Sequence, residues 1–92
     1  MNQNKVIITV VGKDTVGIIA KICTYLADSH INVLDISQTI VQDFFNMMMI
    51  ADIAGCEKAF DTVQNDLVEL GKNIGVEVKC QREEIFERMH RL

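Results

Sequence analysis

Residues 10–20 read Val-Val-Gly-Lys-Asp-Thr-Val-Gly-Ile-Ile-Ala, and this stretch decides the fold. At Asp14 a short β-branched run gives way to helical spacing, which predicts a strand, a glycine-flanked turn and a helix in succession. Asp14 is the expected N-cap, Gly12 can take a backbone angle closed to other residues, and Gly17 is expected in the first helical turn. There it would let a ligand or another backbone approach closely. The free N–H groups at the helix start would suit a ligand carboxylate.

The rest of the chain continues this alternation of strand-like and helix-like spacing. The expected elements, in chain order, span residues 5–11, 15–29, 32–42, 44–53, 57–74 and 76–81. The first strand is apolar on both faces and should lie inside the sheet. Two right-handed crossovers joined by a hairpin predict an α+β fold: a ferredoxin-like βαββαβ sandwich, with a four-stranded antiparallel sheet and two helices on one face.

The same spacing indicates which side chains are buried. In the first helix the expected stripe comprises Val16, Ile19, Cys23, Leu26 and Ala27, with Ile22 beside them. In the third strand the face toward the helices should consist of Phe45, Met47, Met49, Ala51 and Ile53. The opposite face carries Phe44, Met48 and Ile50 and is more apolar than a solvent-facing sheet needs to be, which predicts contact with a partner.

The short length of the chain limits how many domains it can form. We expect one domain over residues 1–92, with a core over residues 5–81 and a short amphipathic helix over residues 83–92. That helix should dock onto a subunit through Ile85, Phe86, Met89 and Leu92. A chain of this length buries only about 60 to 65% of its unfolded surface, so dimerisation would add stability.

Composition and charge argue against several classes of partner. The net charge is −4 and no Lys/Arg cluster occurs, so a nucleic-acid backbone has nothing to bind. The longest apolar run, residues 47–51, is too short for a membrane span, and the polar start is no signal peptide. Three cysteines without a C-x-x-C pair indicate reduced thiols and argue against a disulfide framework or a metal site. A cytoplasmic protein is expected.

Catalysis finds no support in the sequence, and we expect no catalytic residues and no cofactor. His30 and His90 lie far apart at expected helix ends, and no motif links either to a nucleophile. Cys23 falls in a buried stripe, where a thiol behaves as a small hydrophobe.

Other functions of the same fold lack their residues here. Residues 12–17 contain neither the two cysteines of a heavy-metal-binding domain nor the arginine with which an acylphosphatase cradles phosphate. An RNA-recognition module carries solvent-facing aromatics on both central strands within a basic setting, and the first strand has none.

Three short strings carry a family resemblance: Val-Gly-Lys-Asp at residues 11–14, Gly-Ile at 17–18 and Asp-Ile-Ser-Gln at 35–38. With them the chain resembles an ACT domain, a small regulatory module that binds amino acids and similar metabolites. The resemblance covers residues 5–81. It is closest to small stand-alone bacterial ACT proteins, related to the ACT units of glycine-cleavage repressors and formyltetrahydrofolate deformylase. The 92 residues hold neither the second ACT unit nor the catalytic domain of those two.

The resemblance implies a ligand site shared between subunits. In this family two subunits commonly pair side by side through their edge second strands and first helices, with the effector at the interface. On that pattern a ligand would lie between Asp14, Thr15, Val16, Gly17 and Ile18 of one subunit and Asn32, Val33, Leu34, Asp35 and Ile36 of the other. Asn32 matches a frequent polar residue of the family. Asp35 could accept from a ligand ammonium or serve as a charged blocker on an edge strand.

Two functions stay open at this point. One is a non-enzymatic sensor that forms a homodimer or a higher oligomer, binds an amino acid or related metabolite, and signals to an unidentified protein target. The other is a constitutive protein–protein interaction module without a metabolite ligand. They differ in whether the subunit interface holds a pocket with unpaired polar groups or is packed shut.

Overall fold

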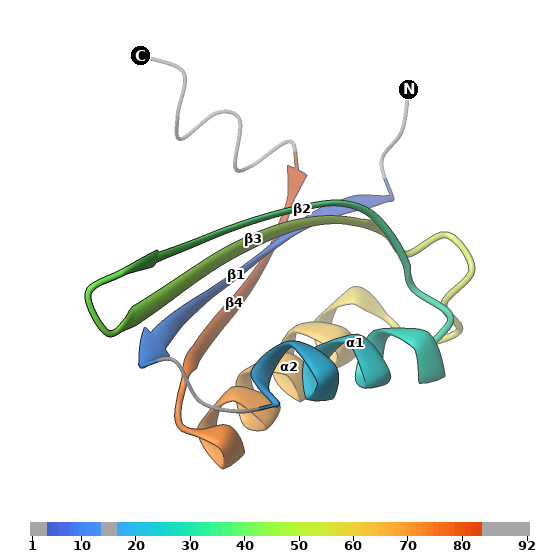
Figure 1. The fold of residues 1–92 in the computed structure, drawn as a ribbon. Coiled ribbons are helices and arrows are strands. Elements are labelled where there is room, and N and C mark those ends of the chain that lie inside the picture. The colour runs from blue at the N-terminus through green and yellow to red at the C-terminus, as the bar shows by residue number, and fades with distance from the viewer. Residues whose placement is uncertain (1–3, 14–16, 84–92) are drawn as a thin grey trace.

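The computed structural model describes residues 4–13 and 17–83, which form a sheet and two helices (Figure 1). In chain order the elements are β1 (Lys5–Lys13), α1 (Ile18–Asp28), β2 (Asn32–Val41), β3 (Phe44–Asp52), α2 (Phe60–Ile74) and β4 (Glu77–Arg82). This order confirms the α+β, ferredoxin-like βαββαβ fold. Residues 14–16 and the predicted C-terminal helix from residue 84 onward lie outside the described residues.

The sheet has the strand order β2-β3-β1-β4, and each neighbouring pair is antiparallel. The prediction that β1 is an interior strand is therefore confirmed, and β2 and β4 form the two edges. Both helices lie on one face of the sheet, as predicted (Figure 1). Within the described ranges, the opposite face carries no helix.

The predicted hairpin is present as β2 and β3, and it closes through a two-residue turn. Val41 pairs with Phe44 across it, and Gln42 has a φ of 56°, the left-handed conformation that such turns use. At the other end of the hairpin Asn32 pairs with Asp52. A β-bulge interrupts the ladder between Val33 and Asp35, so that Leu34 has no partner in the register.

The core lies between the sheet and the helices. From β1 it takes Val6, Ile8 and Val10, and from β3 it takes Phe45, Met47, Met49 and Ala51. The predicted helix-facing side of β3 is thus confirmed, except that Ile53 follows the end of the strand and is only half-buried. The helices contribute Ile18, Ile22, Leu26, Val63 and Leu67.

The first helix begins later than predicted. Its N-cap is Gly17, with a φ of 88°, so the assignments of Asp14 as N-cap and of Gly17 to the first helical turn are wrong. A residue in the left-handed conformation cannot continue a right-handed helix, and only glycine adopts that conformation readily. The buried stripe is correspondingly Ile18, Ile22 and Leu26, whereas Ile19, predicted to be buried, is exposed.

The second helix also starts about three residues late, at Phe60, but it ends as predicted. Gly75 has a φ of 83° and donates its N–H to the carbonyl of Lys72 at 3.4 Å. Gly12 does not use the wider range of backbone angles open to glycine, because it lies within extended β1 and its φ is not positive. Close packing accounts for that glycine instead: a Cβ there would lie 2.7 Å from Cγ1 of Val76.

Candidate functional site

The first half of the predicted ligand site is the start of α1. A Cβ built on Gly17 would meet no described atom within 4 Å, so the space beside this residue is open. The carbonyl of Gly17 accepts from the N–H of Lys21 at 2.9 Å, and the preceding amides of the first turn have no partner inside the helix. The side chain of Ile18 is 3% exposed and belongs to the core, which leaves only its backbone for a ligand. Asp14, Thr15 and Val16 lie outside the described residues.

The second half of the predicted ligand site consists of the first five residues of β2. The side chains of Asn32, Leu34, Asp35 and Ile36 are exposed, and Val33 is half-buried. The bulge at Leu34 lies in the middle of this segment. β-bulges are common at sheet edges and beside functional sites, where they change the direction of side chains. This segment therefore presents an amide, a carboxylate and two apolar groups on an irregular strand edge.

One chain keeps Gly17 and Asn32 apart. Gly17 lies at the N-terminus of α1, whereas Asn32 follows its C-terminus, and the 11 residues of the helix between them span about 16 Å. Figure 1 shows α1 starting near the end of the sheet where β1 stops and running back toward the start of β2. An amino acid is far shorter than this separation. A site that uses both Gly17 and Asn32 therefore needs a second copy of the chain.

The edge strand β2 has the properties of an interface. It is 10 residues long and has a strand neighbour on one side only in the described part of the chain. Its exposed apolar side chains, with their exposed fractions, are Leu34 45%, Ile36 42%, Ile40 57% and Val41 56%. Its single charged side chain is Asp35. Natural proteins guard solvent-exposed edges with short strands, charges or proline, and β2 has little of this protection.

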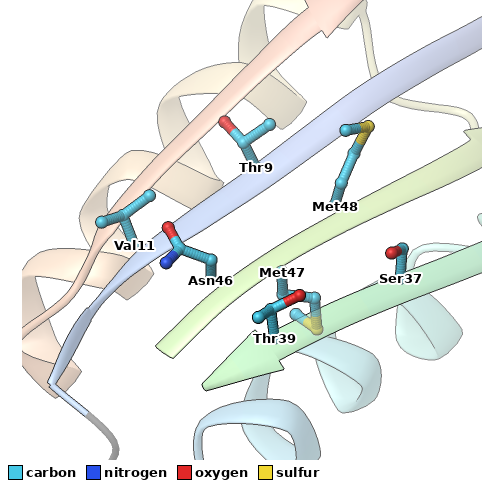
Figure 2. Close-up of a pocket in the computed structure, with 7 residues that line it drawn as sticks. All are labelled: Thr9, Val11, Ser37, Thr39, Asn46, Met47 and Met48. Carbon is cyan, nitrogen blue, oxygen red and sulfur yellow. The ribbon is translucent and has the colours of Figure 1, made fainter. Parts of the chain in front are cut away.

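A groove of about 240 Å³ crosses the sheet face opposite the helices (Figure 2). The residues that line it are Thr9, Val11, Ser37, Thr39, Asn46, Met47 and Met48. The strand register places Ser37, Met48 and Thr9 in one row and Thr39, Asn46 and Val11 in the next. Of these residues the sequence singled out Met48 for its position on this face. The polar ones escaped notice because single Thr, Ser and Asn residues in strands are ordinary solvent-facing choices.

A polar cluster joins the two helices on the other face of the molecule. The Tyr25 hydroxyl donates to Oδ2 of Asp66 at 2.7 Å, and Nζ of Lys58 lies 3.3 Å from the same oxygen. Nζ of Lys58 also lies 4.7 Å from the centroid of the Tyr25 ring. The hydrogen bond from Tyr25 lowers the pKa of the Asp66 carboxyl, while burial and Asp66 raise the pKa of Tyr25. These contacts fix α1 against α2.

The candidate metal ligands and the thiols of the described residues do not gather at one site. Within residues 4–13 and 17–83 no group of three His, Cys, Asp or Glu side chains is placed to hold a metal ion. Burial raises the pKa of Cys80 to about 11, so this thiol stays protonated at neutral pH. Cys23 and Cys56 are half-buried and unpaired by disulfides. Neither described helix has the length and apolarity to span a membrane.

Comparison with known proteins assigns the chain to a family. Residues 4–81 match the ACT domain model. The chain belongs to the ACT domain family. This confirms the resemblance drawn from residues 11–14, 17–18 and 35–38, and the ACT unit covers nearly all of the sequence.

Individual relatives agree with this assignment. The chain is 61% identical to a UPF0237 protein of Bifidobacterium longum over 98% of this chain and 100% of the relative. The structure of an ACT domain protein from Streptococcus pneumoniae is similar with a TM-score of 0.81 and 36% identity, covering 94% of this chain and 97% of that one. A formyltetrahydrofolate deformylase from Pseudomonas syringae pv. tomato shares the fold, with a TM-score of 0.78, 15% identity, and coverage of 85% of this chain and 27% of that one.

Proposed function

We propose that this ACT protein is a non-enzymatic regulatory sensor that binds an amino acid or related metabolite between two copies of the chain. Ligand binding at that interface would change the surface offered to a protein target. The family assignment supports a regulatory, small-molecule-binding role. The three free cysteines fit a reducing compartment such as the cytoplasm.

The observation that carries the proposal is the separation of Gly17 from Asn32 by the length of α1, together with the apolar edge of β2. Antiparallel pairing of β2 with β2 of a second copy about a twofold axis reverses the direction of the second strand. Asn32 of the second copy then lies toward the Val41 end of the first chain. That is the end where Lys13 pairs with Phe44 and where the chain leads on to Gly17. Pairing of the two edges would therefore bring Asn32 of one copy toward Gly17 of the other.

The two halves are chemically complementary to an amino acid. The unpaired amides and the positive end of the α1 dipole suit a carboxylate. The amide of Asn32 can donate and accept, and the carboxylate of Asp35 can accept from an ammonium group. The side chains of Leu34 and Ile36 would bury the apolar part of the ligand and the edge of the partner. Asp14, Thr15 and Val16 complete this proposed site from outside the described residues.

A thermal-shift screen against the twenty amino acids tests the proposal, because a ligand that binds only the folded state raises Tm in proportion to RT ln(1 + [L]/Kd). We expect at least one amino acid to raise Tm. Gly17→Asn should abolish that shift, because asparagine tolerates the left-handed backbone angle while its side chain fills the open space. Gly75→Asn is the matched control, with a similar φ of 83° and equally open space at the far end of α2. It should keep the shift.

A constitutive interaction module is the second candidate, and the four exposed apolar side chains of β2 favour it. In that case the edges would pair without leaving room for a ligand. The screen separates the two, since the module predicts a dimer whose Tm responds to no amino acid.

A further inference from the structure

The two edges of the sheet run in opposite directions, which would allow copies of the chain to join without end. Each neighbouring pair in the order β2-β3-β1-β4 is antiparallel, so β4 is antiparallel to β2. A copy shifted sideways by simple translation would therefore place its β4 antiparallel beside β2, with its helices on the same face. Such a head-to-tail contact leaves a new edge at each end and repeats into a filament. Pairing of β2 with β2 of a second copy closes at two copies.

The second helix packs along β4 from one end of the strand to the other. Near the start of α2, Cζ of Arg82 lies 4.4 Å from the centroid of the Phe60 ring. One turn further along, Nε2 of Gln64 donates to the carbonyl of Cys80 at 2.7 Å. Near the end of α2, a Cβ built on Gly71 would lie 2.7 Å from a β4 side chain, so the lack of a side chain lets the helix come this close.

The side chain of Gln64 reaches β4 from the outer edge of the sheet. Successive residues of a helix point about 100° apart, so Gln64 and Asp66 point about 200° apart. Asp66 faces α1, because its carboxylate accepts from the Tyr25 hydroxyl at 2.7 Å. The first helix contacts β2 and the second contacts β4, so α1 lies on the β2 side of α2. Gln64 therefore faces away from α1 and approaches Cys80 from outside the sheet.

This hydrogen bond occupies the middle of the β4 edge. In an antiparallel ladder the N–H and C=O of one residue point to the same side, and the side alternates along the strand. Because the Cys80 carbonyl accepts from outside, the outward-pointing backbone groups of β4 belong to Val78, Cys80 and Arg82. Cys80 is the central residue of the three. A strand added to this edge would have to displace the Gln64 amide.

The β2 edge is more accessible than the β4 edge. It is 10 residues long, against 6 for β4, and all its side chains are exposed except that of Val33, which is half-buried. In β4 the side chains of Val78 and Cys80 are buried under α2. Covering an edge with a helix is one way in which proteins prevent unwanted strand pairing.

We infer that Gln64 and the close packing of α2 confine strand pairing to the β2 edge, so that assembly by extension of the sheet stops at two copies. The partner that this arrangement admits is the β2 edge of a second copy, and the partner that it excludes is the β4 edge. The inference rests on the β2 pairing of the proposed function.

Sedimentation across a concentration series tests the inference, with circular dichroism to confirm folding. The wild type should reach a constant mass of two chains. Gln64→Leu removes the donor to Cys80 at a similar side-chain size, and its mass should continue to rise beyond two chains. Gln64→Ala should do the same without adding an apolar side chain. Asn65→Leu is the matched control, because it adds a leucine at the next, exposed position of α2 and leaves the hydrogen bond intact. It should keep the wild-type mass.

A second substitution shows whether the growth uses the β2 edge. Adding Ile40→Lys to Gln64→Leu should end the growth, because head-to-tail pairing also needs β2. Folded Gln64 variants that keep the wild-type mass would overturn the inference. Growth that survives Ile40→Lys would overturn it as well, and so would a wild type whose own mass rises past two chains. A monomeric wild type would contradict the proposed function instead, and growth of the Gln64 variants would then still support the role of Gln64.

Discussion

Replacing Ile40 by lysine should weaken the proposed homodimer while leaving the subunit folded. Ile40 is 57% exposed on the helix-side face of β2, opposite the buried Phe45 of β3. Pairing of two β2 edges would cover the exposed half of this side chain, which is worth about 1 kcal/mol of the roughly 2 kcal/mol for full burial. A twofold axis doubles each substitution, so Ile40→Lys removes about 2 kcal/mol and raises the dimer Kd roughly thirtyfold. The two lysine charges oppose pairing further.

Sedimentation of each variant across a concentration series measures that Kd. Val11→Lys is the matched control, because Val11 is 45% exposed but lies on β1, separated from the β2 edge by β3. The control should keep the wild-type Kd, and circular dichroism should show both variants folded. An unchanged Kd for Ile40→Lys, or an equal loss in Val11→Lys, would refute the β2 edge as the interface.

Three further predictions concern the subunit itself. Gly71→Ala should destabilise the fold by about 1 to 3 kcal/mol in urea titrations, although alanine is normally favoured inside a helix, because its Cβ would lie 2.7 Å from the Val76 carbonyl oxygen. Burial raises the pKa of Cys80 from 9.0 to about 11, so its contribution to stability is complete below pH 9 and is lost as the pH rises from 9 to 11. Between pH 9 and 11 the free energy of unfolding should fall less steeply in Cys80→Ala than in the wild type. Equal slopes in the two proteins would contradict a raised pKa of Cys80. Tyr25→Phe should raise the pKa of Asp66 in an NMR titration, because it deletes the hydrogen bond that lowers this pKa.

The sequence was sufficient for the fold because the apolar spacing of each element is strong. The β-branched run of β1 and its apolar second face predicted an interior strand, and the odd-numbered side chains of β3 predicted the face that packs on the helices. Gly75 marked the end of α2. These features depend on local periodicity and on burial, which short stretches of sequence record directly.

The local structure around the proposed site was harder to predict from the sequence, for physical reasons. Asp14 has the chemistry of an N-cap, but the left-handed backbone at Gly17 decides where α1 begins. No periodicity signals that angle, since glycine is equally compatible with the first helical turn. The packing role of Gly12 could not be predicted from its surroundings in the sequence, because the contact that excludes a side chain comes from Val76, far along the chain. The bulge at Leu34 depends on pairing with β3 and leaves no local trace.

Mixing two binding-deficient variants tests most directly whether two copies build the ligand site. Gly17→Asn damages the first half of each site and Asn32→Ala the second, so neither variant alone should bind the amino acid found by the thermal-shift screen. Random exchange at equal concentrations makes half the dimers mixed, and each mixed dimer holds one intact site, which restores about a quarter of the wild-type binding sites. Calorimetric titration should show this recovery in the mixture and no binding to either variant. A mixture that binds no more than its separate components would contradict a site shared between subunits.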